Sequence, residues 1–321
     1  MYLNHFGLDT EPFGLTPNTK FYCKLKTHEQ ILAAIMNSIK TGNGFIKVIG
    51  EVGVGKTLLC RNLLNKISDD YHTCYIPNPD LSPLGLRRSI ANELGFDLSH
   101  DSDQYEIEKA INEGLIQKAK QGKKIILLVD EAQALSNEGL ETLRLITNLE
   151  TETSKLLLII LFAQPELDER LSQYNMRQLM QRITYSFYLA SISKEEIPRY
   201  LAFRLLSAGH EDGQIFSRKA CKLLFKISNG WPRVLNIIAD KSMLAAFYNN
   251  NRQICTETVY HAIQDSFHVI ETTSNTRWTK KWLKFCTSIM TSNTKKNSLA
   301  AIAILASAVL FNYTLYLYLI R

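Results

Sequence analysis

The stretch Phe45-Ile-Lys-Val-Ile-Gly50-Glu-Val-Gly-Val-Gly55-Lys56-Thr57 decides the fold. Its apolar, β-branched start ends at Gly50, which predicts a strand followed by a tight turn. The spacing G-x-x-x-x-G-K-T then places two glycines, a lysine and a hydroxyl at the start of a helix. Glycines let backbone N–H groups curl around phosphate oxygens, and a helix N-terminus favours anions. The stretch therefore predicts a loop that binds the phosphates of a nucleotide.

Two residues of this loop carry the chemistry. We expect Lys56 to reach the β- and γ-phosphates and the Thr57 hydroxyl to ligate Mg²⁺. The expected cofactors are ATP and Mg²⁺. The residues predicted to bind them are Gly50, Glu51, Val52, Gly53, Val54, Gly55, Lys56, Thr57 and Leu58.

An acidic pair, Asp130 and Glu131, directly follows five apolar residues at positions 125–129. A continuous apolar run predicts a strand buried on both faces, and the carboxyl end of such a strand faces the ligand crevice. We expect Asp130 to hold Mg²⁺, partly through its waters, and Glu131 to polarise the attacking water. The alternative is that both are ordinary acids of a surface turn.

Four further polar residues are candidate site residues. Gln164 follows a second apolar run and can orient the water, or simply begin a helix. Arg177 or Arg182 can reach the γ-phosphate of a neighbouring subunit as an arginine finger, although a surface ion pair explains either one equally well. Arg233 opens a late helix and can bridge it to the phosphates, with a helix-cap salt bridge as the alternative.

Strands alternate with helices up to about residue 190, which predicts an α/β fold with a parallel five-stranded sheet. After that point only helix signals appear, beginning with the capping box of Ser193 and Glu196. The expected organisation is an N-terminal segment flanking the nucleotide (1–44), the P-loop domain (45–190), an all-helical lid (191–270), a basic linker (271–298) and a transmembrane helix (299–320).

Residues 299–320 contain no charged side chain. At ~1.5 Å per residue, such a helix spans the ~30 Å hydrocarbon core of a bilayer. Lys295 and Lys296 precede it and only Arg321 follows, so the positive-inside rule places the P-loop domain in the cytoplasm. We therefore expect a single-pass protein of the bacterial inner membrane. The alternative, a buried C-terminal helix, would need a large extra core.

The formal net charge of +6 lies in the tail. Seven basic residues and one acidic residue occupy positions 271–321, which leaves 30 of each sign in the first 270. A neutral body argues against nucleic acid as a partner, because neutralising phosphates needs clustered Lys and Arg. The six cysteines form no C-x-x-C pair and the histidines show no metal-ligand spacing, so we expect reduced thiols and no zinc site.

Over about residues 1–267 the chain resembles AAA+ ATPases of the general secretion component A (ExeA-like) family, and most closely those of MSHA-type pilus biogenesis. The pieces that carry the resemblance are Met1-Tyr-Leu-Asn-His-Phe-Gly-Leu8, Tyr75-Ile-Pro-Asn-Pro-Asp80, Leu128-Val-Asp-Glu-Ala-Gln133 and Gly230-Trp-Pro-Arg-Val-Leu-Asn236. The resemblance implies a helical lid, a ring or other homo-oligomer, and inner-membrane pilus or secretion proteins as partners.

The resemblance also implies individual roles. Gln164 takes the place of the first sensor and Arg233 that of the second, while the segment from Phe6 to Phe21 flanks the adenine. Secretion-type relatives carry a peptidoglycan-binding domain beyond their membrane span. Here only Arg321 follows the span, so cell-wall binding is not expected.

The leading expectation is a membrane-anchored ATPase that drives assembly or placement of a type IV pilus or type II secretion complex. Two alternatives stay open. One is a DNA-associated AAA+ ATPase of the transposition-targeting type, which shares the core architecture. The other is a nucleotide-gated scaffold that binds ATP and scarcely hydrolyses it.

Overall fold

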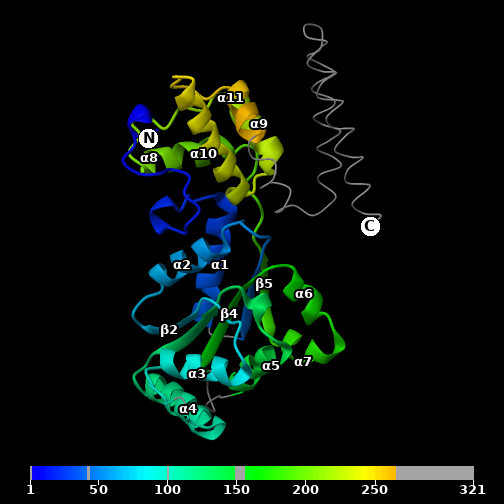
Figure 1. The fold of residues 1–321 in the computed structure, drawn as a ribbon. Helices are drawn as coiled ribbons and strands as arrows, with labels where there is room; N and C mark the ends of the chain where they lie inside the picture. The colour runs from blue at the N-terminus through cyan, green and yellow to red at the C-terminus, as the bar shows by residue number, and fades with distance from the viewer. Residues whose placement is uncertain (1, 42–43, 100, 149–155, 265–321) are drawn as a thin grey trace. The chain divides into compact units, whose positions relative to one another are not determined.

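The computed structural model describes residues 2–41, 44–99, 101–148 and 156–264 (Figure 1). Within these residues no helix is both long enough and apolar enough to cross a membrane. The expected basic linker at 271–298 and the expected transmembrane helix at 299–320 lie outside the described residues.

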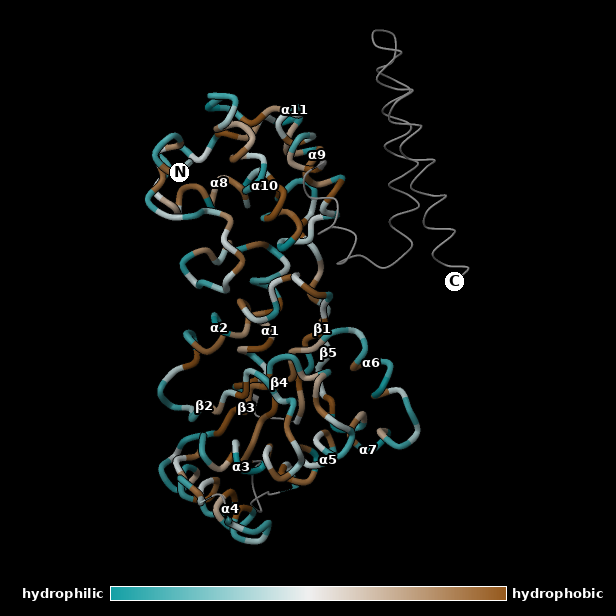
Figure 2. The backbone as a smooth tube through the Cα atoms, viewed as in Figure 1, coloured by the Kyte–Doolittle hydropathy of each residue, from teal (hydrophilic) through white to brown (hydrophobic). Residues whose placement is uncertain are grey.

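A five-stranded sheet forms the centre of the α/β part, in the order β2-β3-β4-β1-β5 with every pairing parallel. This confirms the α/β fold and the parallel sheet expected from the sequence. Every residue of β4 is buried, as its unbroken apolar run predicts, and Figure 2 shows β3 and β4 as hydrophobic segments. The strands are β1 (Phe45–Ile49), β2 (Tyr71–Ile76), β3 (Lys124–Val129), β4 (Leu157–Ala163) and β5 (Ile183–Tyr188).

Helices cover both faces of the sheet. One face packs against α1 (Lys26–Thr41) and α2 (Lys56–Lys66). The opposite face packs against α3 (Pro83–Glu93), α4 (Gln104–Lys120), α5 (Asn137–Ile146), α6 (Glu166–Leu171) and α7 (Arg177–Met180). The connection from β1 to β2, which contains α2, crosses the sheet in one direction, and the connections from β2 to β5, which contain α3 to α7, cross it in the other. Because such crossovers are right-handed, opposite directions place their helices on opposite faces of the sheet.

The strand order decides where the loops at the carboxyl ends of the strands meet. Strand β4 lies between β1 and β3, and its residue Ala163 is level with Ile49 of β1. Val129 of β3 is level with Leu161 of the same strand. The residues that follow these three strands therefore emerge side by side at one edge of the sheet.

A buried lysine, Lys47, lies in the middle of β1 and is 4% exposed. Its ammonium group pairs with the carboxylate of Asp168 in α6, and the Tyr188 hydroxyl donates to the same carboxylate at 2.6 Å. A buried charge is tolerated only when it is paired and hydrogen-bonded. This contact ties β1, α6 and the end of β5 together beneath the phosphate loop.

Within the described residues, four helices follow the sheet: α8 (Ile197–Ser207), α9 (Arg218–Ser228), α10 (Pro232–Tyr248) and α11 (Thr256–Gln264). The capping box predicted that α8 begins at Ser193, and that prediction is wrong by about one turn. Ser193 does hydrogen-bond to the Glu196 carboxylate at 2.8 Å, but the helix begins at Ile197 with a proline in its first turn. Proline is favoured there because its missing N–H would have no partner in the helix.

Candidate functional site

A cavity of about 300 Å³ opens where the phosphate loop, the N-terminal segment and the late helices meet. Its lining comes from six separate stretches of the chain. These residues are Gly14, Leu15, Thr16, Pro17, Asn18 and Phe21; Val52, Gly53, Gly55, Lys56, Thr57 and Leu58; Glu131 and Gln164; and Tyr200, Arg204, Pro232, Arg233 and Asn236.

The phosphate loop joins β1 to α2, and two of its glycines are required by its shape. Gly53 and Gly55 have φ of 77° and 105°, in the left-handed region that favours glycine. A Cβ atom on Gly53 would also lie 2.6 Å from the Cβ of Arg233. Gly55 directly precedes α2, so the backbone N–H groups of the first turn of α2 face the cavity side of the loop.

Lys56 is 4% exposed and lies across the curve of this loop. Its Nζ donates to the carbonyl oxygens of Gly50 at 2.8 Å and Glu51 at 3.1 Å. Burial lowers the pKa of Lys56, while the nearby charges of Glu131 and Asp130 oppose that change. The ammonium group is therefore held by the loop at the wall of the cavity, where phosphate oxygens would meet it.

Asp130 follows β3 and is 2% exposed. It accepts the backbone N–H of Glu131 at 3.0 Å and a hydrogen bond from Thr57. Burial raises the pKa of Asp130, and these hydrogen bonds oppose the rise. The two expected magnesium ligands, Thr57 and Asp130, are thus in contact.

One hydroxyl and one carboxylate suit Mg²⁺, which keeps several waters and takes other ligands from substrate phosphates. Among the described residues no group of three or more His, Cys, Asp or Glu side chains could hold a metal by itself. The donor set at Thr57 and Asp130 therefore fits a magnesium ion that arrives with the nucleotide.

The Asp130→Asn variant should be more stable than the wild type when no nucleotide is bound. Because burial raises the pKa of Asp130, its ionised form destabilises the fold at neutral pH, and an amide removes that charge. We expect the free energy of unfolding at pH 7 to rise by about 0.5–2 kcal/mol, as measured by urea denaturation. The gain should shrink as the pH falls, because the wild-type carboxyl then becomes protonated. The stabilisation by MgATP should also shrink, and a variant that gains as much from MgATP as the wild type would contradict the assigned magnesium role.

Glu131 faces the cavity and is held by two amide side chains. Its Oε2 accepts from Gln133 Nε2 at 2.5 Å and from Gln164 Nε2 at 3.1 Å. The backbone N–H of Gln164 in turn donates to Gln133 Oε1 at 3.0 Å. Glu131 has a φ of 50°, which is uncommon for a non-glycine residue and clusters at functional sites. Sequence reasoning missed Gln133, and its only signal was its place two residues after the Asp130-Glu131 pair.

Arg233 begins α10 directly over the phosphate loop. Its backbone N–H donates to the carbonyl of Gly53 at 3.2 Å, and its side-chain carbons pack against Gly53. Arg233 also lines the cavity. The structure thus brings together Lys56, Glu131, Gln164 and Arg233 around one space.

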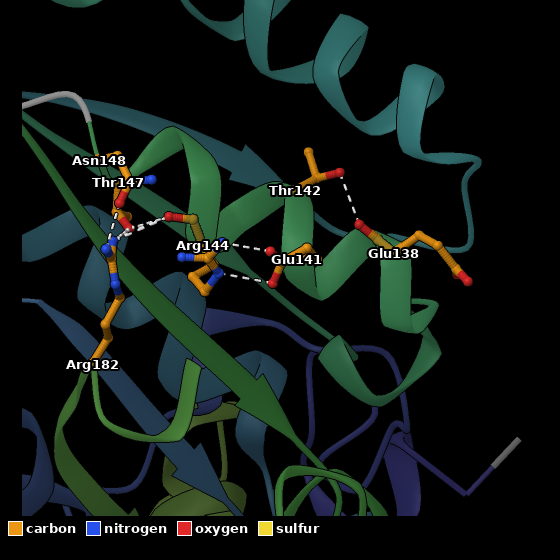
Figure 3. Close-up of polar contacts among 7 residues, drawn as sticks. All are labelled: Glu138, Glu141, Thr142, Arg144, Thr147, Asn148 and Arg182. Atoms are coloured by element: carbon orange, nitrogen blue, oxygen red, sulfur yellow. Dashed lines mark hydrogen bonds and ion pairs between the residues drawn. The ribbon is translucent and has the colours of Figure 1, made fainter. Parts of the chain in front are cut away.

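Arg177 and Arg182 do not line this cavity. Figure 3 shows Arg182 bound to the end of α5: it donates to Arg144 O at 3.2 Å and Thr147 Oγ1 at 2.7 Å, and also to the Asn148 amide oxygen. A cation at a helix C-terminus satisfies carbonyl groups that the helix leaves unpaired. The Arg177 guanidinium instead lies 4.3 Å from the ring centre of the exposed Tyr174 and donates to its hydroxyl at 2.7 Å. Arg177 is therefore the better placed of the two to reach a second subunit.

The Arg182→Ala variant should be less stable than the wild type by about 1–3 kcal/mol, because three acceptors at the end of α5 lose a charged donor. Arg177→Ala is the matched control and should change the free energy of unfolding by less than ~0.5 kcal/mol, because its partner is a surface side chain. Urea denaturation of both variants measures the difference. Equal stability of the two would contradict the capping role of Arg182.

The N-terminal segment contributes to the cavity over only part of its expected range. Residues 14–18 and Phe21 line it, whereas Phe6 is buried against the rings of Tyr2 and His5. Sequence reasoning also missed Tyr200 and Asn236. Their helices were expected, but nothing local distinguishes a pocket-facing position on a helix from a core-facing one.

Comparisons with known proteins give one family match and one curated relative. Residues 39–171 match the AAA domain family. The chain is 38% identical over 254 residues to the general secretion pathway protein A of Aeromonas hydrophila, a match that covers 79% of this chain and 46% of the relative. The chain therefore spans about half the length of this curated relative.

Solved structures share the fold at low sequence identity. Cdc6p from Pyrobaculum aerophilum aligns with a TM-score of 0.59 and 19% identity, over 78% of this chain and 71% of its own. The Aeropyrum pernix ORC1 protein, solved in complex with DNA, aligns with a TM-score of 0.58 and 16% identity, over 79% and 69%. At these identities the likeness shows the fold alone.

Proposed function

Because the chain carries an AAA domain at residues 39–171, we propose that it is an ATPase that binds and hydrolyses MgATP in the cavity beside Lys56. One observation carries the proposal: Lys56, Glu131, Gln164 and Arg233 line the same space, although they come from four distant parts of the sequence. A lysine for phosphate charge, a fixed carboxylate for water and a magnesium pair are the parts that phosphoryl transfer to water needs.

The residues have distinct roles in this proposal. The loop amides and Lys56 hold the phosphates, and Thr57 and Asp130 hold the magnesium ion. That ion neutralises charge on the β- and γ-phosphates when it is bound. Glu131 accepts a proton from the attacking water, and Gln164 fixes the orientation of the Glu131 carboxylate.

Release of phosphate from MgATP by the purified full-length chain tests this proposal. Magnesium-dependent turnover supports the proposal. If no turnover occurs at any of the protein concentrations tested, the proposal is contradicted. The measurement should be repeated over a range of protein concentrations, because an arginine supplied by a second subunit makes turnover rise with assembly. The contacts of Arg177 make it the candidate for that role.

For the cellular process, we propose that the ATPase is anchored in the bacterial inner membrane, with its nucleotide site in the cytoplasm, and serves a secretion or MSHA-like pilus complex. The support is the 38% identity to a general secretion pathway protein A and the uncharged run at 299–320. Extraction of cell membranes at high pH tests the anchor, because a spanning protein stays in the pellet and a peripheral one is released.

A DNA-associated role makes a different prediction. Binding to DNA through phosphate contacts should weaken steeply as salt rises. Binding of the full chain to a DNA duplex at 50 and 200 mM salt therefore separates the two proposals. No binding at either salt concentration supports the secretion or pilus role.

A further inference from the structure

Three largely buried polar side chains line the cavity and are not among the residues assigned above to the phosphates or the magnesium ion. They are Tyr200 and Arg204 on α8 and Asn236 on α10, and each is 5–6% exposed. Arg204 also donates to the carbonyls of Pro12 at 2.5 Å and Gly14 at 3.1 Å. The group therefore joins two late helices to the N-terminal segment, which also lines the cavity.

The hydrogen bonds in this group run in one direction. Arg204 has only donors, so its Nη1 donates to the Tyr200 oxygen at 3.1 Å. Burial raises the pKa of Tyr200, so its hydroxyl keeps its proton and donates it to Asn236 Oδ1 at 2.8 Å. The oxygen of the Asn236 amide is thereby fixed toward Tyr200, and its Nδ2 points away from it.

The Nδ2 group of Asn236 has no hydrogen-bond partner among the described residues, and Asn236 lines the cavity. An amide donor that opens into the cavity and has no protein partner is free to bond to an acceptor on whatever occupies that cavity. The phosphates are an unsuitable source of that acceptor. Arg233, one turn earlier on α10, already lies over Gly53 of the phosphate loop, so Asn236 lies farther from that loop.

We propose that Asn236 reads the base of ATP, with its Nδ2 donating to an acceptor nitrogen of the adenine ring. This inference rests on the proposed function and adds a specificity-determining residue to it. Arg204 and Tyr200 are positioning residues that act through Asn236. The ring nitrogens of adenine are acceptors of the required kind, and Phe21 and residues 14–18 line the same cavity beside Arg204.

The test compares ATP with ribose 5′-triphosphate, which lacks only the base. Dissociation constants are measured by calorimetry on the full-length chain carrying Glu131→Gln, so that ATP survives the titration. Adding Asn236→Asp replaces the donor with an acceptor of the same shape. We expect ATP to bind ~10-fold or more weakly and ribose 5′-triphosphate to change by less than ~2-fold. The added charge acts equally on the identical phosphates of both ligands.

A second variant keeps the test decisive if Asn236→Asp fails to fold. Tyr200→Phe removes the hydroxyl that fixes the Asn236 amide and keeps the ring. It should weaken ATP binding by a smaller factor than Asn236→Asp does, and it should leave the binding of ribose 5′-triphosphate unchanged. The inference is overturned if the affinities for both ligands fall by the same factor, or if ATP affinity is unchanged in the variant that folds. If the chain with native Asn236 and Tyr200 binds no ATP, the proposed function itself fails.

Discussion

The Lys56→Ala variant is expected to lose MgATP binding, with a dissociation constant raised more than ~100-fold. Lys56 is buried at the wall of the cavity, and its ammonium is held there by the carbonyls of Gly50 and Glu51. Hydrogen bonds to charged groups contribute about 1.5–3 kcal/mol each, so losing two to the phosphates accounts for this change. Calorimetric titration with a slowly hydrolysed ATP analogue measures it.

Lys66→Ala is the matched control for Lys56→Ala. Lys66 ends the same helix, is 41% exposed in its side chain and has its ammonium 3.7 Å from the Glu29 carboxylate. Its removal should leave nucleotide affinity unchanged. Comparable affinities in the Lys56 and Lys66 variants would show that the nucleotide, if bound, lies elsewhere.

The Glu131→Gln variant is expected to bind MgATP with unchanged affinity and to hydrolyse it ~10²- to 10⁴-fold more slowly. The amide keeps the size of the side chain and can still accept from Gln133 and Gln164, but it is a far weaker base. Single-turnover phosphate release, measured beside binding affinity, separates loss of the base from loss of the site.

Glu138→Gln is the control for Glu131→Gln, because Glu138 is an exposed acid at the start of α5. It should turn over at the wild-type rate. If Glu131→Gln did the same, Glu131 would not be the base, and a nucleotide-gated scaffold would become the better interpretation of the chain.

The parts of the site that could be predicted are those that local sequence specifies. A glycine-rich turn between a strand and a helix has a fixed spacing, and the acidic pair sits at the end of an unbroken apolar run. The continuous apolar runs of β3 and β4 can be recognised in the sequence because a strand covered on both faces needs apolar residues at nearly every position. The predicted run at 125–129 agrees with β3 to within one residue.

The parts that could not be predicted depend on contacts between distant segments. Arg177 and Arg182 are equivalent in the sequence, yet the structure ties Arg182 to the end of α5 and leaves Arg177 at the surface. The bond from Gln133 to Glu131 follows from a left-handed backbone at Glu131, which no local pattern predicts for glutamate. The direction of the Asn236 amide depends on a chain of hydrogen bonds that starts on another helix.

The contact between α10 and the phosphate loop has a consequence for the timing of the reaction cycle. Among the described residues, one backbone hydrogen bond from Arg233 to Gly53 and the packing of the Arg233 side-chain carbons on Gly53 join the start of that helix to the loop. Such a bond contributes only about 0.5–1.5 kcal/mol net, so thermal motion can break it without unfolding either part. In the proposed ATPase cycle, a brief separation of the two would let ADP leave and ATP enter, and the lifetime of bound ADP should shorten whenever a binding partner pulls that helix away.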